Sequence, residues 1–379
     1  MKNHEYIKQN CQFEQNSYQI SNEDQSKKAS DIQCLLVSMK LFFGLSYLSI
    51  PNSFLLGGVI GGSFVLTFVV TLNYITMRQC LAVAAQYPHA KSYSELAFAV
   101  FGKNGKVMID ICICITQITC CIAYQYFAAS SIDFIICEYS DHNHCYGNKL
   151  FMILITIPVI FFSFLGTYKA LSYLSLPSLI ITIMGMITIF VYSFDKISLS
   201  ERGVFQDVQW FNYQAVLGRV GMIMHIFAGN PSIINIQSEA RNVKRYPKIL
   251  TIAVFILLLL FNVYGFVAYT AYREKTQPIF IMSMTPFDGF ILFVFLCFSF
   301  NSMTSYPVQI LTAFQIVEKF EFYQKIEISY YLKRCLSRSI IIISVTGICL
   351  LVPNFTDFLN ISGNSISLSI NGRRLAAGF

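Results

Sequence analysis

Two short stretches of small residues interrupt apolar runs that are otherwise long enough to form helices. The first reads Gly-Leu-Ser-Tyr-Leu at 44–48, and the second reads Phe-Ala-Gly-Asn-Pro at 227–231. A helix that breaks inside a membrane leaves N–H donors at the start of one half and carbonyls at the end of the other. The N–H end attracts a carboxylate, and the carbonyl end attracts a cation or an ammonium group. Together the two breaks predict a binding site for a zwitterion.

The candidate binding residues are the members of both stretches and one tyrosine of another apolar run. They are Gly44, Leu45, Ser46, Tyr47, Phe227, Ala228, Gly229, Asn230 and Tyr124. A competing interpretation treats each break as a simple kink in a packed helix, because glycine and proline are tolerated in membrane spans. Tyr124 also has a competing role, since buried tyrosines often only pack or bond locally. Two breaks in corresponding positions favour the binding site.

Ionisable and hydroxyl groups near the breaks are candidates for ion coupling. A charge inside a membrane span costs at least about 2.5 kcal/mol, so Lys40, within the first apolar run, is the foremost candidate. His225 lies before the second break as a candidate proton relay, and a hydrogen-bonded core histidine is the alternative. Ser302 and Ser305 suit a cation, or they serve helix packing.

The composition places these residues in a membrane protein. Of the 379 residues, 55% are hydrophobic and 12% are charged, whereas about 25% of the residues of soluble proteins are charged. Apolar runs of about 20 residues alternate with short polar connectors, which predicts a multi-pass all-α integral membrane protein. We expect spans at about 35–56, 59–85, 107–137, 150–165, 172–193, 214–238, 249–272, 287–316 and 339–352, followed by a partial tenth.

We expect these spans to form one transporter domain over residues 34–370. Residues 1–33 are polar and lack the apolar stretch of a signal peptide, so they predict a disordered cytoplasmic tail. Residues 371–379 form a second, short polar tail. The tenth apolar segment is too polar and too short for a full span, and the predicted fold is therefore incomplete at its C-terminus.

The basic residues predict the orientation of the chain. They concentrate in the connectors at 241–248 and 318–338, which places these connectors and the N-terminus in the cytoplasm. The net charge of +7 is spread over such connectors, so we expect the lipid bilayer and no nucleic acid as a partner. Cys137 and Cys145 flank an outer connector, where a disulfide and two free thiols both stay open.

Three stretches resemble the amino acid/auxin permease family of the amino acid, polyamine and organocation superfamily. Residues 40–58 are similar to its pattern of Lys, Gly-x-Gly-x-Leu-x-x-Pro, an aromatic residue and Gly, with Ser46 in place of the second Gly. Residues 225–242 resemble its Phe-Glu-Gly stretch, with Ala228 in place of the Glu. Residues 305–318 resemble its Ser/Thr-Tyr-Pro-hydrophobic-Gln stretch. The similarity extends from residue 35 to about residue 365.

The resemblance implies the leucine-transporter fold, in which two inverted five-helix repeats carry discontinuous first and sixth spans. It further implies secondary active amino acid transport by alternating access, with symport of H⁺ or Na⁺. Lys40 resembles the proton-coupled and vacuolar branches, whereas Ala228 replaces one natural proton carrier. The coupling ion therefore stays open, as does the choice between the plasma membrane and the vacuolar or lysosomal membrane.

Three alternatives compete with transport. The chain is a sensor that binds an amino acid without carrying it, a non-transporting truncated form, or a polytopic membrane enzyme. An enzyme needs a constellation of His, Asp or Glu near one membrane face, and the sequence has no convincing one. The sequence also has no P-loop pattern, which argues against an ATP-driven pump that uses this motif. We therefore expect no catalytic residue, no metal site and no cofactor apart from a co-transported ion.

Overall fold

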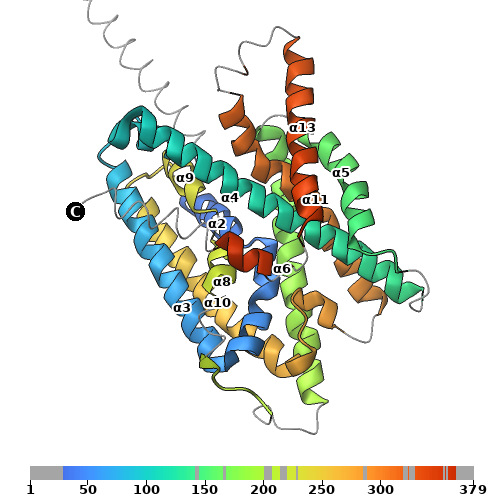
Figure 1. Cartoon of the computed structure of the whole chain (residues 1–379). Helices are drawn as coiled ribbons and strands as arrows, with labels where there is room; N and C mark the ends of the chain where they lie inside the picture. The colour runs from blue at the N-terminus through green and yellow to red at the C-terminus, as the bar shows by residue number, and fades with distance from the viewer. Residues whose placement is uncertain are drawn as a thin grey trace, which may run out of the picture.

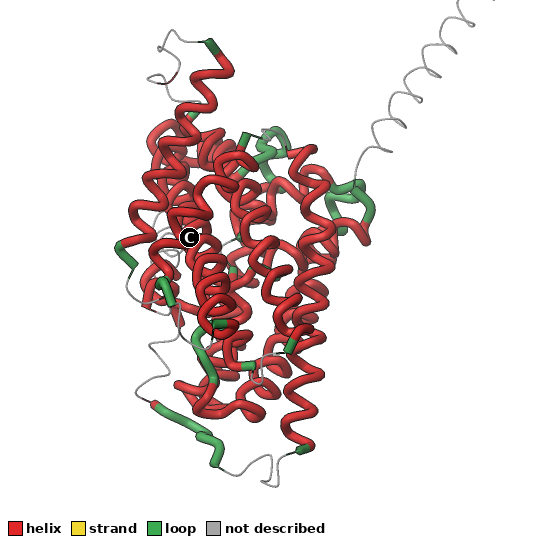
Figure 2. Tube along the Cα trace, turned by 90° about the vertical axis from the view of Figure 1, so that its right-hand side faces the viewer, coloured by secondary structure: helices red, strands yellow, loops and turns green. Residues whose placement is uncertain are grey.

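The computed structural model describes residues 29–140, 145–164, 168–199, 207–213, 220–227, 229–284, 288–318, 323, 329–352, 355 and 357–363. These residues are almost entirely helical, and the long helices run roughly side by side (Figure 2). The elements in chain order are α2 (Asp31–Phe42), η1 (Leu45–Ser49), α3 (Ile50–Ala84), α4 (Tyr93–Tyr139), α5 (Asn148–Ser163), α6 (Tyr168–Ser198), α8 (Val220–Ile226), η3 (Asn230–Ser232), α9 (Ile233–Glu239), α10 (Tyr246–Tyr272), η4 (Arg273–Lys275), η5 (Phe280–Ser283), α11 (Gly289–Val317) and α13 (Tyr330–Leu350).

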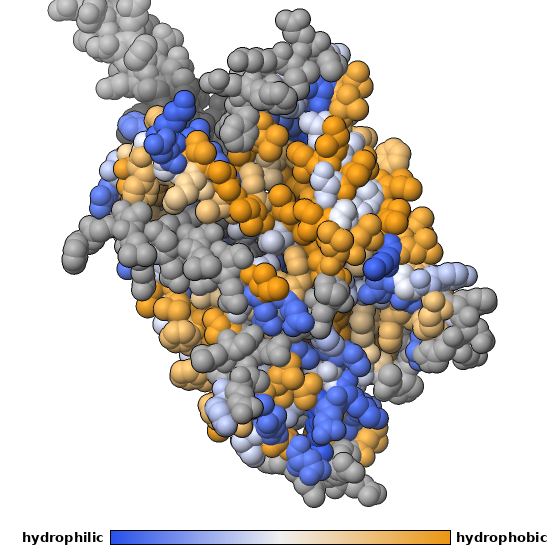
Figure 3. All heavy atoms as spheres, in the orientation of Figure 1, coloured by the Kyte–Doolittle hydropathy of each residue, from blue (hydrophilic) through white to orange (hydrophobic). Residues whose placement is uncertain are grey.

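Several helices are long and apolar enough to cross a bilayer. Within the described residues these are Leu45–Ala84, Tyr93–Glu138, Pro177–Ser198, Tyr246–Lys275 and Gly289–Val317. Large apolar side chains remain exposed on the outer faces of the helices, and Figure 3 shows hydrophobic side chains gathered over α13 and its neighbours. Such a surface suits lipid rather than water, so the predicted multi-pass membrane protein is confirmed.

The helices form two packed groups. One group consists of α5, α11 and α13 packed on α4, and the other consists of α2, α3 and α6 packed on α10 (Figure 1). The two main clusters of buried apolar side chains follow these groups in part, because the larger cluster also includes residues of α4 and of the first half of α11. The helix α6 also contacts α11, and it thereby connects the two groups.

The first predicted break is present between α2 and α3. Ser30 caps α2, because its Oγ accepts a hydrogen bond from the Gln33 amide at 3.3 Å. The helix therefore begins at Asp31, inside the predicted tail at 1–33, of which residues 1–28 lie outside the described part. After Phe42 the backbone leaves the helix, becomes extended at Gly44 and then forms the 3₁₀ turn η1.

The predicted first and second spans join at a single residue, Gly58. Its φ of +78° kinks α3, and a Cβ there would lie 2.6 Å from the backbone of Trp210. Three hydrogen bonds hold this bend to residues 207–213. The Val59 amide donates to the Gln209 carbonyl at 3.0 Å, the Ile60 amide donates to the Trp210 carbonyl at 2.9 Å, and the Asn212 amide donates to the Gly57 carbonyl at 3.0 Å. Only glycine meets both demands without strain.

The second predicted break separates α8 from α9. The helix α8 ends at Ile226, and the chain resumes in the short turn η3 before α9. Ala228 lies outside the described residues. At the end of α9, the Ala29 amide donates to the Glu239 carbonyl at 2.9 Å, and the Arg241 amide donates to the Ala29 carbonyl at 2.9 Å. The start of the first broken span is therefore tied to the end of the sixth.

Buried polar side chains cross-link the group around α4. Gln125 Nε2 of α4 donates to the Met152 carbonyl at 2.9 Å and approaches the hydroxyls of Thr156 at 3.1 Å and Thr346 at 2.9 Å. Unpaired polar groups are costly in a low-dielectric core, so these contacts fix α4, α5 and α13 relative to each other.

An arginine links α13 to α5 and α11. Arg338 of α13 is buried; its Nη2 lies 3.0 Å from Glu318 Oε1, and its Nη1 donates to the Ser163 carbonyl at 2.9 Å. The guanidinium also lies 5.0 Å from the centre of the Phe314 ring. Arg338 of α13 thereby joins the C-terminal ends of α5 and α11 through one largely buried ion pair.

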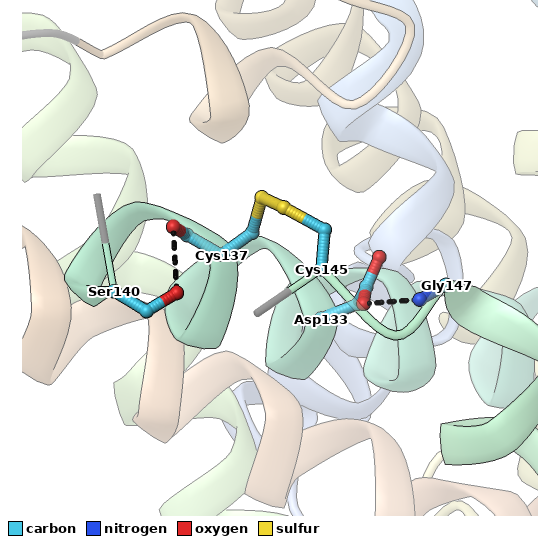
Figure 4. The surroundings of a disulfide bond; sticks show 5 residues. All are labelled: Asp133, Cys137, Ser140, Cys145 and Gly147. Atoms are coloured by element: carbon cyan, nitrogen blue, oxygen red, sulfur yellow. Dashed lines mark hydrogen bonds between the residues drawn. A yellow bond between two sulfur atoms is a disulfide. The ribbon is translucent and has the colours of Figure 1, made fainter. Parts of the chain in front are cut away.

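Cys137 and Cys145 form a disulfide (Figure 4). This settles the choice left open by the sequence. The bond connects the end of α4 to the turn before α5, where Asp133 Oδ1 also accepts a hydrogen bond from the Gly147 amide at 2.9 Å. The other cysteines that the structure describes are free thiols, and several of them are buried.

Candidate functional site

A cavity lies where the two helix breaks meet. Within the described residues its lining consists of Leu41, Gly44, Leu45, Ser46, Cys120, Ala123, Tyr124, His225, Ile226, Gly229, Gln309 and Phe355. Its volume is about 40 Å³ for the centres of water-sized molecules, and one water needs about 10–15 Å³ on such a measure. The described part of the cavity therefore has room for a few waters.

The glycines of the two breaks keep the backbones close. A Cβ on Gly229 would lie 2.6 Å from Leu41 Cγ and 3.0 Å from the Leu41 carbonyl oxygen. A Cβ on Gly44 would lie 3.5 Å from the hydroxyl oxygen of Tyr124 on α4. The absence of side chains at both positions lets the two broken helices approach each other and lets the tyrosine hydroxyl reach the first break.

The lining contains polar groups but, within the described residues, no charged side chain. Ser46, Tyr124, His225 and Gln309 supply the side-chain donors and acceptors, and the breaks add backbone amides and carbonyls. His225 is buried, and its Nδ1 lies 3.1 Å from the hydroxyl oxygen of Ser362. This arrangement is suited to binding a small molecule whose charges are satisfied by helix ends.

The structure brings only some of the predicted residues to the cavity. Gly44, Leu45, Ser46, Tyr124, Gly229 and the ion-coupling candidate His225 line it. Tyr47 is not on the described lining. Its side chain is fully buried, and its ring packs on that of Tyr264 with centres 5.4 Å apart. Phe227 packs on Phe42 at 5.2 Å between ring centres. Both rings belong to the packing around the breaks.

The remaining ion-coupling candidates are not on the described lining of the cavity. Lys40 lies in the last turn of α2, next to the lining residue Leu41. Ser302 Oγ donates to the Phe298 carbonyl at 2.8 Å, as a helix-packing serine does. Ser305 Oγ donates to Asn301 Oδ1 at 3.3 Å and lies 3.5 Å from the Ser178 hydroxyl.

Asn230 is bound by a residue that the sequence did not single out. Its Nδ2 donates to Asn73 Oδ1 at 2.7 Å, and Asn73 Nδ2 donates to the Val69 carbonyl at 3.0 Å. Asn73 is buried on α3, so it anchors the second break to that helix. An asparagine inside an apolar run was the available signal, because such residues need an internal partner.

Six lining residues were not predicted either. They are Leu41, Cys120, Ala123, Ile226, Gln309 and Phe355. Gln309 had a signal, since it is a polar residue within an apolar run and belongs to the stretch at 305–318 that carries the family resemblance. Phe355 had none, because it follows the last full predicted span and belongs to neither break.

A family comparison identifies the chain. The model described as "Transmembrane amino acid transporter protein" matches residues 27–371, which include both breaks and every described lining residue. The chain belongs to this family. The resemblance seen in the three stretches is therefore confirmed.

Family relatives include Vacuolar amino acid transporter 3 of Schizosaccharomyces pombe, which is 27% identical over 292 residues, covering 77% of this chain and 43% of the relative. Vacuolar amino acid transporter 4 of Saccharomyces cerevisiae is 24% identical, covering 75% and 40%. This chain thus spans less than half the length of these fungal relatives. Amino acid transporter AVT3A of Arabidopsis thaliana is 23% identical, covering 85% of this chain and 75% of the relative.

Solved structures share the fold at low sequence identity. Mhp1, a nucleobase-cation-symport-1 family transporter in a closed conformation, matches with a TM-score of 0.64 and 9% identity, covering 93% of this chain and 79% of that one. MhsT in complex with L-phenylalanine matches with a TM-score of 0.57 and 13% identity, covering 90% and 89%. The predicted leucine-transporter-type fold is confirmed. The family's named members are transporters rather than enzymes, as predicted.

Proposed function

We propose that this chain is a secondary active transporter that carries an amino acid by alternating access through the cavity between α2–α3 and α8–α9. The observation that carries this proposal is the meeting of two helix breaks around one cavity, with Gly229 against Leu41 and Gly44 beside Tyr124. Helix ends at such a site complement the carboxylate and the ammonium of a zwitterion. The names of the fungal and plant relatives support an amino acid as the substrate.

The substrate's side chain is uncharged in this proposal. The backbone ends satisfy the two charges of the zwitterion, and the described lining has no Asp, Glu, Lys or Arg for a third. An unpaired charge in a dehydrated site is disfavoured by several kcal/mol. Arginine, lysine, aspartate and glutamate should therefore be poor substrates.

We further propose symport with H⁺ or Na⁺ and a cytoplasmic N-terminus. His225 is the candidate proton acceptor, because it lines the cavity with its ring bonded to Ser362. The orientation agrees with the disulfide: Cys137 and Cys145 lie at the opposite end of α4 from Tyr93, and disulfides persist on the non-cytosolic side of membranes. The vacuolar membrane is the proposed location, on the names of the fungal relatives.

Uptake into proteoliposomes that contain the purified 379-residue chain tests the proposal. Radiolabelled neutral, basic and acidic amino acids are compared while the pH gradient and the Na⁺ gradient are varied independently. Saturable uptake of neutral amino acids that follows one gradient is the expected result. Uptake that follows neither gradient would contradict symport, and binding without uptake would favour the sensor.

A further inference from the structure

Phe355 brings an aromatic ring to the cavity from outside the two broken spans. It follows α13, only 7% of its surface is exposed, and its ring stacks on that of Tyr126 with centres 5.1 Å apart and planes 20° apart. Tyr126 belongs to α4, which also supplies the lining residues Cys120, Ala123 and Tyr124. The ring is therefore held against α4 at the edge of the site.

The helical turns after Phe355 are attached to α8. Asn360 Oδ1 accepts a hydrogen bond from the Met222 amide at 3.0 Å, and the Ser362 hydroxyl lies 3.1 Å from His225 Nδ1. Gly363 lies directly against the backbone of Gly221. These contacts restrain the segment 357–363 on the first half of the broken sixth span, and they restrain the backbone that carries Phe355.

The chemistry of a phenyl ring decides which part of the substrate it meets. It has no donor or acceptor for a carboxylate or an ammonium, and the break glycines expose the backbone groups that suit those charges. Much of the remaining described lining is already small: Gly44, Ser46, Cys120, Ala123 and Gly229. The larger side chains of the described lining are those of Leu41, Leu45, Tyr124, His225, Ile226, Gln309 and Phe355, and Phe355 is the only phenylalanine among them. Its ring therefore takes up room that an apolar substrate side chain would otherwise use.

We infer that Phe355 sets the upper size limit for the side chain of the transported amino acid. The inference rests on the proposed function of the cavity. The ring fills space that a larger substrate side chain would otherwise occupy, and its stacking on Tyr126 and the contacts of 357–363 keep it there. Replacing the ring with a methyl group should admit larger side chains.

The test compares the ratio of kcat/KM for phenylalanine to that for alanine in proteoliposomes. Apolar pockets change discrimination by about 10–200-fold for each methylene gained or lost. We expect the ratio to rise at least about tenfold in Phe355→Ala and to fall in Phe355→Trp. Phe358→Ala is the matched control, because Phe358 lies on the same segment, is partly buried and is not on the described lining. It should leave the ratio unchanged.

The ratio of the kcat/KM values for two substrates does not depend on which fraction of a variant is folded, because the amount of active protein cancels. An unchanged ratio in Phe355→Ala, with uptake intact, would overturn the size limit and leave the transport function standing. If binding occurs without uptake, amino-acid-induced thermal stabilisation of the purified protein gives the corresponding ratio of dissociation constants for phenylalanine and alanine, which should shift in the same direction. If the wild-type chain shows neither uptake nor stabilisation by any amino acid, both the proposed function and the size limit are wrong.

Discussion

Substitution of Gly229 by alanine probes the meeting of the two breaks most directly. The Gly229 backbone has φ of −71° and ψ of −6°, which alanine adopts without strain. The added methyl would lie 2.6 Å from Leu41 Cγ and 3.0 Å from the Leu41 carbonyl oxygen, both well inside van der Waals contact. The variant therefore isolates a steric effect, since no hydrogen bond and no charge is removed.

The size of this effect follows from overpacking. Extra methyl groups in a well-packed region cost about 1–3 kcal/mol, and the Leu41 side chain can yield more easily than its carbonyl. If half or more of that cost falls on closing the site around substrate, kcat/KM for uptake should drop about 2–160-fold.

Two glycines serve as controls in the same uptake assay. Gly347→Ala adds a methyl on α13 where nothing lies within 4 Å, so transport should not change. Gly44→Ala places a methyl in ordinary contact with the Tyr124 hydroxyl at 3.5 Å, so it should mainly raise KM. Wild-type kcat/KM in Gly229→Ala would refute the reasoning, because the two breaks would then not need to approach as closely as the structure has them.

Three further predictions concern stability in detergent. Glu318→Gln should cost about 3 kcal/mol, because it leaves the buried guanidinium of Arg338 without its carboxylate; thermal unfolding checks this, and an unchanged Tm would contradict it. Cys137→Ser should cost about 2–3 kcal/mol through the entropy of the opened loop, and reduction of the wild type should lower Tm equally. The pKa of Asp288 lies below its usual 3.8, because its carboxylate accepts a hydrogen bond from the Tyr192 hydroxyl, which has the largest effect, and one from the Ile291 amide. The ionised carboxylate should therefore add to the free energy of unfolding above pH 3.8, and this contribution should be lost as the pH falls below 3.8. Tyr192→Phe should make the pH-dependent change in Tm smaller.

Much of the architecture was accessible from the sequence because membranes impose simple rules. The predicted spans at 249–272 and 287–316 correspond closely to α10 and α11, since apolar runs of that length have few alternatives. The breaks were accessible for the same reason: irregular backbone is tolerated at membrane depth only where protein or a cavity surrounds it. The boundary between the predicted spans 35–56 and 59–85 falls at Gly58, but the sequence did not indicate that the two helices continue into each other through one kinked residue.

The orientation of individual side chains was harder to predict. Ser46 and Tyr47 are neighbours in the first break, yet Ser46 lines the cavity and Tyr47 packs on Tyr264. In a 3₁₀ turn consecutive residues point about 120° apart, and the sequence does not indicate where such a turn begins. The roles of Asn73 and Phe355 depend on contacts with residues far away in the sequence. Asn73 and Asn230, for example, are 157 residues apart. No local pattern specifies such contacts.

The bend at Gly58 has a mechanical consequence. The part of α3 before Gly58 and the part after it are joined by that single residue, and residues 207–213 hold the neighbours of the glycine by backbone hydrogen bonds. A tilt of the part before Gly58 would have to be absorbed by the backbone torsions of this residue or passed directly to the rest of α3. The two parts of the helix would therefore move as a coupled pair that turns at one residue. Inserting even one residue at Gly58 should uncouple a movement of the first span from that of the second.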